Sequence, residues 1–170
     1  INESYKKIAV IKGSEKPNED TVNSAHYDNV GMKNGVVYNG EDENGSWTVE
    51  VMEIAEAFKQ TVKEGHGPKR SILFLHVTGE EHGLFGSSYY ADNPVFPLNN
   101  TVAALNIDMI GRDDTENSGQ NYDYVIGTEM LSTDWKKISK DANAKTSQLK
   151  VNYESDNTND TKNLNATSKQ

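Results

Sequence analysis

The amino-acid sequence predicts an α/β fold with a mostly parallel central sheet and helices on both of its faces. Two observations lead to this prediction. Short apolar segments alternate with segments of helical periodicity, which is the pattern of right-handed βαβ units. In addition, residues 71–77 (S-I-L-F-L-H-V) form a nearly continuous apolar run, typical of a parallel strand that is covered on both faces.

The first part of the chain contains predicted strands, a loop and a helix. We expect strands at residues 5–11 and 20–25, and the second of these leads directly to His26. A loop rich in glycine and asparagine follows at residues 31–45. The next segment is predicted to be a helix that begins near Ser46, because its apolar residues recur at helical spacing. These residues are Trp47, Val51, Ile54, Ala55, Phe58 and Val62.

The rest of the chain continues the alternation of strands and helices. In order, we expect a strand at 71–77, a short helix at 86–92, a buried strand at 101–107, a strand at 122–126, a helix at 131–144 and a last strand at 149–153. Residues 154–170 are mainly polar and bury too little apolar surface to order themselves. The predicted organisation is one domain at residues 1–153, followed by a polar loop or disordered tail at residues 154–170.

The composition excludes several classes of partner and of metal site. The formal net charge is -9, so the chain lacks the basic surface that nucleic acids and anionic membranes attract. No stretch approaches the roughly 20 apolar residues of a membrane span. The chain has no cysteine, so any metal ion must be bound by histidine, aspartate or glutamate.

Acidic and imidazole side chains follow three of the predicted strands. His26 and Asp28 follow the second strand, Glu80 and Glu81 follow the strand at 71–77, and Asp108 follows the next one. In open α/β sheets, ligands bind outside the carboxyl ends of the strands. We therefore expect these groups to meet at one edge of the sheet.

Each of these groups also has a simpler interpretation when it is taken alone. Adjacent carboxylates such as Glu80 and Glu81 are usually only a polar turn, although at a strand end they repel each other unless a cation or proton lies between them. A histidine beside Asp28 is usually a surface pair, although such a carboxylate also orients a metal-binding imidazole. Asp108 has two candidate partners, a metal ion and Arg112.

Taken in order, four segments resemble metallopeptidase family twenty-eight, whose members include bacterial leucyl aminopeptidases. The segments are H-Y-D, Y-N-G-E-D-E-N-G-S, T-G-E-E-H-G-L-F-G-S and N-I-D-M-I-G-R. The resemblance extends to about Tyr153. It implies the zinc-exopeptidase fold, also described as phosphorylase/hydrolase-like, and a zinc-dependent aminopeptidase that acts on peptides with a free amino terminus.

The resemblance also implies a role for each residue of the candidate site. His26 and Asp108 would bind one zinc ion and Glu81 the other, with Asp28 orienting His26. The two ions would lie about 3.5–4 Å apart, as in other two-metal hydrolases. Glu80 would be the general base, which takes a proton from the attacking water and passes it to the leaving amine.

The sequence departs from the family pattern in the loop before the first helix. Glu43 stands where the family has the aspartate that bridges the two ions, and Asp42 is the alternative bridging residue if the loop shifts. Trp47 stands where the family has glycine, and we expect its indole to obstruct the close approach of backbone that glycine allows.

The resemblance further implies a longer domain and one more histidine ligand near its end. We therefore expect residues 1–153 to be a partial catalytic domain, incomplete at its C-terminal end, that binds two, one or no zinc ions. The apolar content of 34% agrees, because it is low for a domain of this length.

Two other functions are compatible with the same fold. One is a non-catalytic interaction or receptor-type module, which the altered bridging loop favours. The other is a glutaminyl-cyclase-like enzyme that uses a single zinc ion. The family comparison also predicts a bacterial protein that is secreted or periplasmic.

Overall fold

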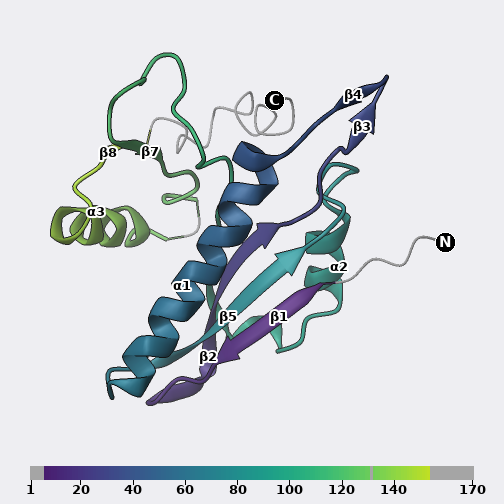
Figure 1. Ribbon diagram of the computed structural model, residues 1–170. Coiled ribbons are helices and arrows are strands. Elements are labelled where there is room, and N and C mark those ends of the chain that lie inside the picture. The colour runs from purple at the N-terminus through teal and green to yellow at the C-terminus, as the bar shows by residue number, and fades with distance from the viewer. Residues whose placement is uncertain (1–5, 131, 154–170) are drawn as a thin grey trace. The chain divides into compact units, whose positions relative to one another are not determined.

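The structure is a computed structural model that describes residues 6–130 and 132–153 (Figure 1). The chain forms two compact units, Ile1–Arg112 (unit 1) and Asp113–Gln170 (unit 2), and each is described by itself. The predicted tail at 154–170 lies outside the described residues, as do the beginning of the first predicted strand and the beginning of the helix predicted at 131–144.

Unit 1 contains a four-stranded sheet in the order β1-β5-β2-β6. Its strands are β1 (Lys7–Ile11), β2 (Lys16–His26), β5 (Arg70–Val77) and β6 (Thr101–Asn106). Strand β2 runs parallel to both β5 and β6, whereas β1 pairs with β5 in the antiparallel direction. The predicted mostly parallel sheet is confirmed.

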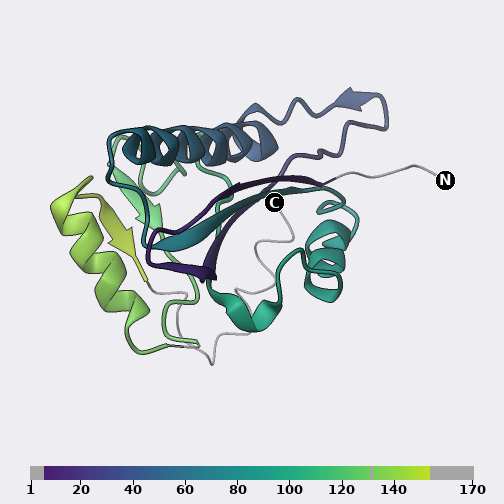
Figure 2. The ribbon, with the colours of Figure 1, turned by 90° about the horizontal axis from the view of Figure 1, so that it is seen from below.

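Helices cover both faces of this sheet, as predicted. Helix α1 (Ser46–Lys63) lies on one face and helix α2 (Phe85–Asp92) on the other (Figure 2). Side chains alternate along β5, so successive residues enter the two apolar clusters in turn. The α2-side cluster contains Val22, Leu73, Leu75, Val77 and Tyr90, and the α1-side cluster contains Ala25, Trp47, Val51, Ile72 and Phe74.

The two buried strands of the prediction differ in their exposure. Strand β5 is the more buried one, because strands flank it on both sides and an apolar cluster covers each of its faces. Strand β6 was expected to be buried, but Val102 and Leu105 are each 47% exposed. Strand β6 is an outer strand of the sheet, with β2 on one side, so its side chains have fewer neighbours.

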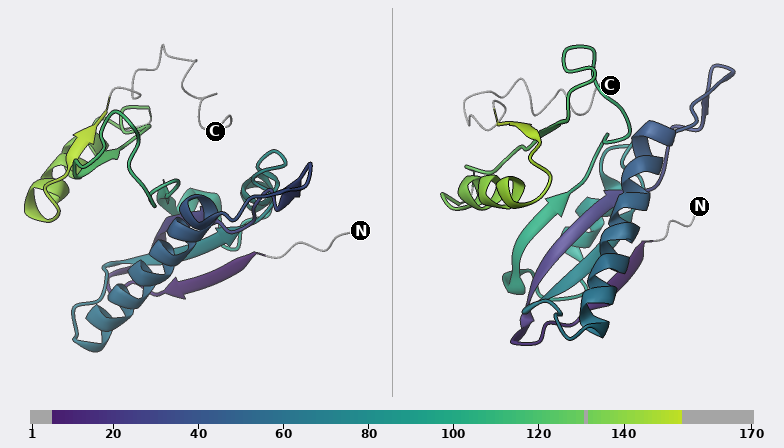
Figure 3. Two further views of the ribbon diagram at one scale, coloured as in Figure 1. Left: turned by 45° about the horizontal axis from the view of Figure 1, so that its top comes forward. Right: turned by 60° about the vertical axis from the view of Figure 1, so that its left-hand side comes forward.

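The segment predicted to be an irregular loop at 31–45 contains regular structure. Strands β3 (Met32–Lys33) and β4 (Val36–Val37) form a hairpin that extends away from the sheet (Figure 3). Asn34 and Gly35 form its turn with φ of 54° and 79°, as a two-residue Asn-Gly turn requires. The π-helical turn η1 (Glu41–Gly45) follows and leads directly into α1.

The remaining elements are short. A 3₁₀ turn, η2 (Leu98–Asn100), precedes β6 in unit 1. Unit 2 consists of strands β7 (Tyr122–Tyr124) and β8 (Lys150–Asn152), which pair in parallel, and helix α3 (Trp135–Lys145). Among the described residues, no helix combines the length and the apolar character that crossing a membrane requires.

Candidate active site

The sheet brings the predicted site residues to one edge of unit 1. Strand β2 ends at His26, which lies opposite Val77, the last residue of the parallel strand β5. Glu80 follows β5 after a short turn, and Asp108 follows β6, which also runs parallel to β2. The carboxyl ends of these three strands therefore deliver the imidazole and the carboxylates to the same edge, as expected for a ligand site in such a sheet.

Asp28 connects the histidine to the glutamate turn. His26 is 4% exposed, and its Nδ1 lies 3.0 Å from the carbonyl oxygen of Asp28 and 3.6 Å from Asp28 Oδ1. The same Oδ1 accepts a hydrogen bond of 3.3 Å from the backbone N–H of Glu80. Donation from Nδ1–H to Asp28 leaves the lone pair on Nε2 of His26 for a metal ion.

Two side chains in the first turn of α1 donate hydrogen bonds to the main chain of His26. Trp47 Nε1 donates a 2.7 Å hydrogen bond to the carbonyl oxygen of His26, and Thr48 Oγ1 donates one of 3.0 Å to the same atom. The Trp47 and His26 rings lie 4.6 Å apart between centroids, and Trp47 is 1% exposed. The structure accommodates the indole at this position, because the ring packs into the α1-side cluster.

Asp42 and Glu43 have different partners in the turn before α1. Asp42 forms an ion pair with Arg112, with 2.7 Å between Asp42 Oδ2 and Nε of Arg112. Glu43 forms a hydrogen bond with the carboxyl group of Glu81. The structure therefore places Glu43, the predicted bridging residue, with the glutamates and pairs Arg112 with Asp42.

The carboxyl groups of this cluster influence one another's protonation. The hydrogen bond to Glu81, followed by burial and by the charges of Glu81, Glu80 and Asp108, raises the pKa of Glu43 to about 7. Burial raises the pKa of Asp108 to about 6; the charge on His26 opposes this and the two glutamates add to it. Burial also raises the pKa of Glu80. Each of these three carboxyl groups therefore keeps its proton to a higher pH than it would in water.

The chemistry of these side chains fits a divalent cation. Oε1 of Glu81 is buried and has no hydrogen-bond partner, which is costly unless a positive charge faces it. Imidazole and carboxylate are the ligands that zinc takes when cysteine is absent. Their spacing is open, however, because no three His, Asp or Glu side chains among residues 6–130 and 132–153 surround a position for an ion.

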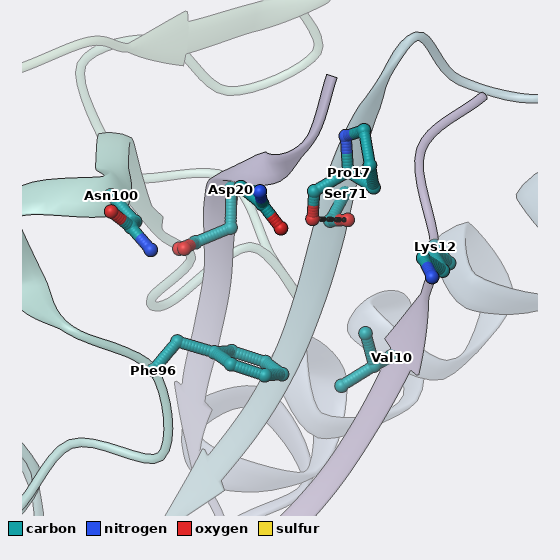
Figure 4. A pocket seen from close by; sticks show the side chains of 8 residues that line it. Val10, Lys12, Pro17, Asp20, Ser71, Phe96 and Asn100 are labelled. Atoms are coloured by element: carbon teal, nitrogen blue, oxygen red, sulfur yellow. Dashed lines mark hydrogen bonds between the residues drawn. The ribbon is translucent and has the colours of Figure 1, made fainter. Parts of the chain in front are cut away.

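Unit 1 also contains a cavity of about 350 Å³ at the opposite end of β2 and β5 (Figure 4). It is lined by Val10, Lys12, Pro17, Asn18, Asp20, Ser71, Phe96 and Asn100. Two of its polar side chains have partners within the protein. Ser71 Oγ donates to the carbonyl oxygen of Pro17 and Thr101 Oγ1 donates to Asp20 Oδ1, both at 2.8 Å. The cavity lies away from His26 and the glutamates, so the candidate chemistry belongs to the other end of the sheet.

Comparison with known proteins identifies the family of this chain. The profile of peptidase family M28 matches residues 7–167. A probable zinc metalloprotease of the fungus Pyrenophora teres f. teres is 30% identical over 154 residues, which are 88% of this chain and 30% of that protein. A probable glutamate carboxypeptidase of Arabidopsis thaliana is 32% identical over 102 residues, 59% of this chain and 14% of that protein.

A solved structure also resembles the fold. The zinc aminopeptidase BSAP from Bacillus subtilis superimposes with a TM-score of 0.67 at 27% sequence identity, over 87% of this chain and 34% of that one. The chain thus spans about a third of the length of these zinc-dependent relatives. Because the family profile matches almost the whole chain, the protein belongs to peptidase family M28.

Proposed function

We propose that this chain carries part of the catalytic centre of a zinc-dependent exopeptidase that removes amino-terminal residues from peptides. The observation that supports this most strongly is the arrangement of His26, Glu43, Glu80, Glu81 and Asp108 at one edge of the sheet, where Oε1 of Glu81 is buried without a partner. The relatives support the metal and the reaction class, since they include probable zinc metalloproteases and a zinc aminopeptidase.

The zinc ligands of this proposal are His26, Asp108, Glu81 and the bridging Glu43. His26 would bind through Nε2, because its Nδ1 faces Asp28. Bound zinc would polarise the scissile carbonyl group and make a water molecule more acidic. Glu43 is one methylene group longer than aspartate, so we expect one or two zinc ions rather than a fixed pair.

Glu80 is the proposed general base. Its backbone N–H is fixed by Asp28, and it is adjacent to Glu81 in the turn after β5. Its carboxylate would take a proton from the attacking water and transfer it to the leaving amine. This division of roles requires that Glu81 binds metal while Glu80 stays free to exchange protons.

Charge and one relative favour the amino terminus of the substrate. Clustered carboxylates attract a substrate ammonium group, and the Bacillus relative is a zinc aminopeptidase. Another relative is a probable glutamate carboxypeptidase, a name that refers to the carboxyl end of a peptide. A non-catalytic binding module is the second candidate, because the described donors do not surround an ion position.

The test is hydrolysis of a peptide with a free amino terminus, of its amino-acetylated form and of a peptide blocked at its carboxyl end. We expect cleavage only when the amino terminus is free, and about 10²–10⁴-fold lower kcat for Glu80→Gln. Glu50→Gln is the matched control, because Glu50 is an exposed residue of α1. Equal cleavage of the acetylated peptide would contradict the aminopeptidase assignment, and activity of Glu80→Gln at the level of Glu50→Gln would contradict the role of Glu80.

A further inference from the structure

Two carboxylates of the candidate site lie outside the regular helices and strands of the sheet layer. Glu43 lies in the η1 turn before α1, and Asp108 lies beyond the end of the outer strand β6. Glu43 has φ of -72° and ψ of -106°, so it breaks the helical conformation of the turn. The last hydrogen bond between β2 and this segment, from Ile107 N–H to the carbonyl oxygen of Ser24 at 3.0 Å, ends just before Asp108, and no sheet bond extends to Glu43.

An ion pair joins these two segments beside the site. Arg112 Nε lies 2.7 Å from Asp42 Oδ2, and Asp42 directly precedes Glu43. The Asp42 side chain is 18% exposed and the Arg112 side chain 74% exposed, so the carboxylate is the anchored partner. Because the carboxylate is partly buried, water and salt screen this ion pair less than a fully exposed one.

Gly111 permits the close approach that this ion pair requires. A Cβ atom at Gly111 would lie 2.7 Å from Asp42 Oδ1, 2.9 Å from Asp42 Cα and 3.0 Å from Ser46 Cβ. Ser46 Oγ in turn donates a 2.6 Å hydrogen bond to the carbonyl oxygen of Asp42. Asp42 is therefore held between the segment after Asp108 and the first residue of α1.

We propose that Arg112 and Asp42 are positioning residues, whose ion pair sets the distance between Glu43 and Asp108. This inference rests on the zinc-binding part of the proposed function. Arg112 follows Asp108 by four positions and Asp42 is adjacent to Glu43, so a rearrangement of the pair displaces both carboxylates. Partners that orient metal ligands typically change metal affinity by about 10–100-fold when they are removed.

The first test measures zinc affinity by competition with a chromophoric chelator. Arg112→Gln is expected to weaken binding by about tenfold or more. Arg70→Gln is the matched control, because Nε of Arg70, the first residue of β5, forms a 2.6 Å ion pair with Glu19 of β2, away from the site. The control is expected to bind zinc like the unaltered protein. Equal affinities of the two variants would overturn the proposal.

A second test separates positioning by Asp42 from direct zinc binding by Asp42, whose Oδ1 is buried without a partner. If Asp42 acts through Arg112, adding Asp42→Asn to Arg112→Gln causes no further loss of zinc affinity. If Asp42 is itself a ligand, the double variant binds zinc about tenfold more weakly than Arg112→Gln. That second result would overturn the positioning role.

Hydrogen exchange on the metal-free protein tests the ion pair independently of zinc. We expect Arg112→Gln to accelerate amide exchange at residues 41–46 and Arg70→Gln to leave these residues unchanged. Unchanged exchange in Arg112→Gln would overturn the proposal even if zinc binds. If the unaltered protein binds no zinc, the proposed function fails, and exchange still shows whether the ion pair orders the Glu43 turn.

Discussion

Trp47 contacts His26 in two ways. It donates a hydrogen bond to the main chain of His26 and packs its indole against the imidazole. Replacement by phenylalanine keeps an aromatic ring but removes the donor and leaves unfilled volume. We expect Trp47→Phe to lower the free energy of unfolding by about 1–3 kcal/mol, measured by chemical denaturation.

Trp135→Phe is the comparison for this prediction, because Trp135 is a partly exposed residue in α3 of unit 2. It should have a clearly smaller effect. If Trp47→Phe unfolds at the same denaturant concentration as Trp135→Phe, the role assigned to Trp47 is wrong.

Asp114 provides a prediction about pH in unit 2. Its Oδ2 accepts a 2.8 Å hydrogen bond from the Tyr124 hydroxyl group, and its Oδ1 accepts one of 2.7 Å from the backbone N–H of Asn117. These bonds, that from Tyr124 most of all, lower the pKa of Asp114 to about 2, against an ordinary value of 3.8. The folded state thus binds this proton less readily, so the contribution of Asp114 to stability is present above pH 4 and lost as the pH falls from about 4 to about 2.

Thermal unfolding of unaltered protein and Asp114→Asn between pH 5 and pH 2 measures this contribution. The two melting temperatures should differ most at pH 5 and converge at the acid end. A difference that is constant over this range would contradict the assigned hydrogen bonds.

Some residues of the candidate site could be predicted from the sequence and others could not. His26, Glu80, Glu81 and Asp108 follow strands, and the parallel arrangement of those strands brings their ends together. The contacts of Trp47 were not predictable in the same way. They join segments that are distant along the chain, and only the packing of α1 against the sheet reveals that the indole fits beside the imidazole.

At the scale of elements, the short helix α2 depends on a single glycine. A Cβ atom at Gly86 would lie 2.2 Å from the carbonyl oxygen of Thr78 and 2.9 Å from Val77 Cβ. Gly86→Ala must therefore displace the first turn of α2 from the end of β5. We expect this substitution to lower the free energy of unfolding by about 1–3 kcal/mol or more, as overpacking does.

Ser88→Ala in the same helix is the control, since Ser88 is exposed and alanine favours helix. Denaturation curves of the two variants provide the comparison. Stability of Gly86→Ala at the level of Ser88→Ala would show that α2 does not pack as closely as described.

Elements were predictable where periodicity and burial agree. Helix α1 and strand β5 begin and end within about a residue or two of their predicted limits, because long apolar patterns define them. The β3–β4 hairpin was missed, although Asn34-Gly35 is a strong turn signal, because its strands have only two residues each. The burial of β6 was overestimated because apolar composition does not distinguish an outer strand from a central one.

At the scale of the whole molecule, family membership and the arrangement of the sheet agree. The chain matches the M28 profile over residues 7–167 and spans about a third of the length of its zinc-dependent relatives. Its net charge of -9 includes the carboxylate cluster, in which Oε1 of Glu81 is buried without a hydrogen-bond partner. The central claim is therefore that this edge of the sheet binds zinc.

The measurement that tests this claim most directly is the zinc content of the purified 170-residue chain after exhaustive dialysis, by elemental analysis together with calorimetric titration. We predict between one and two zinc ions per folded chain, and a loss of at least one ion in Glu81→Gln but not in the surface variant Glu50→Gln. A chain that is folded by circular dichroism, retains no zinc and shows no binding heat would contradict the account.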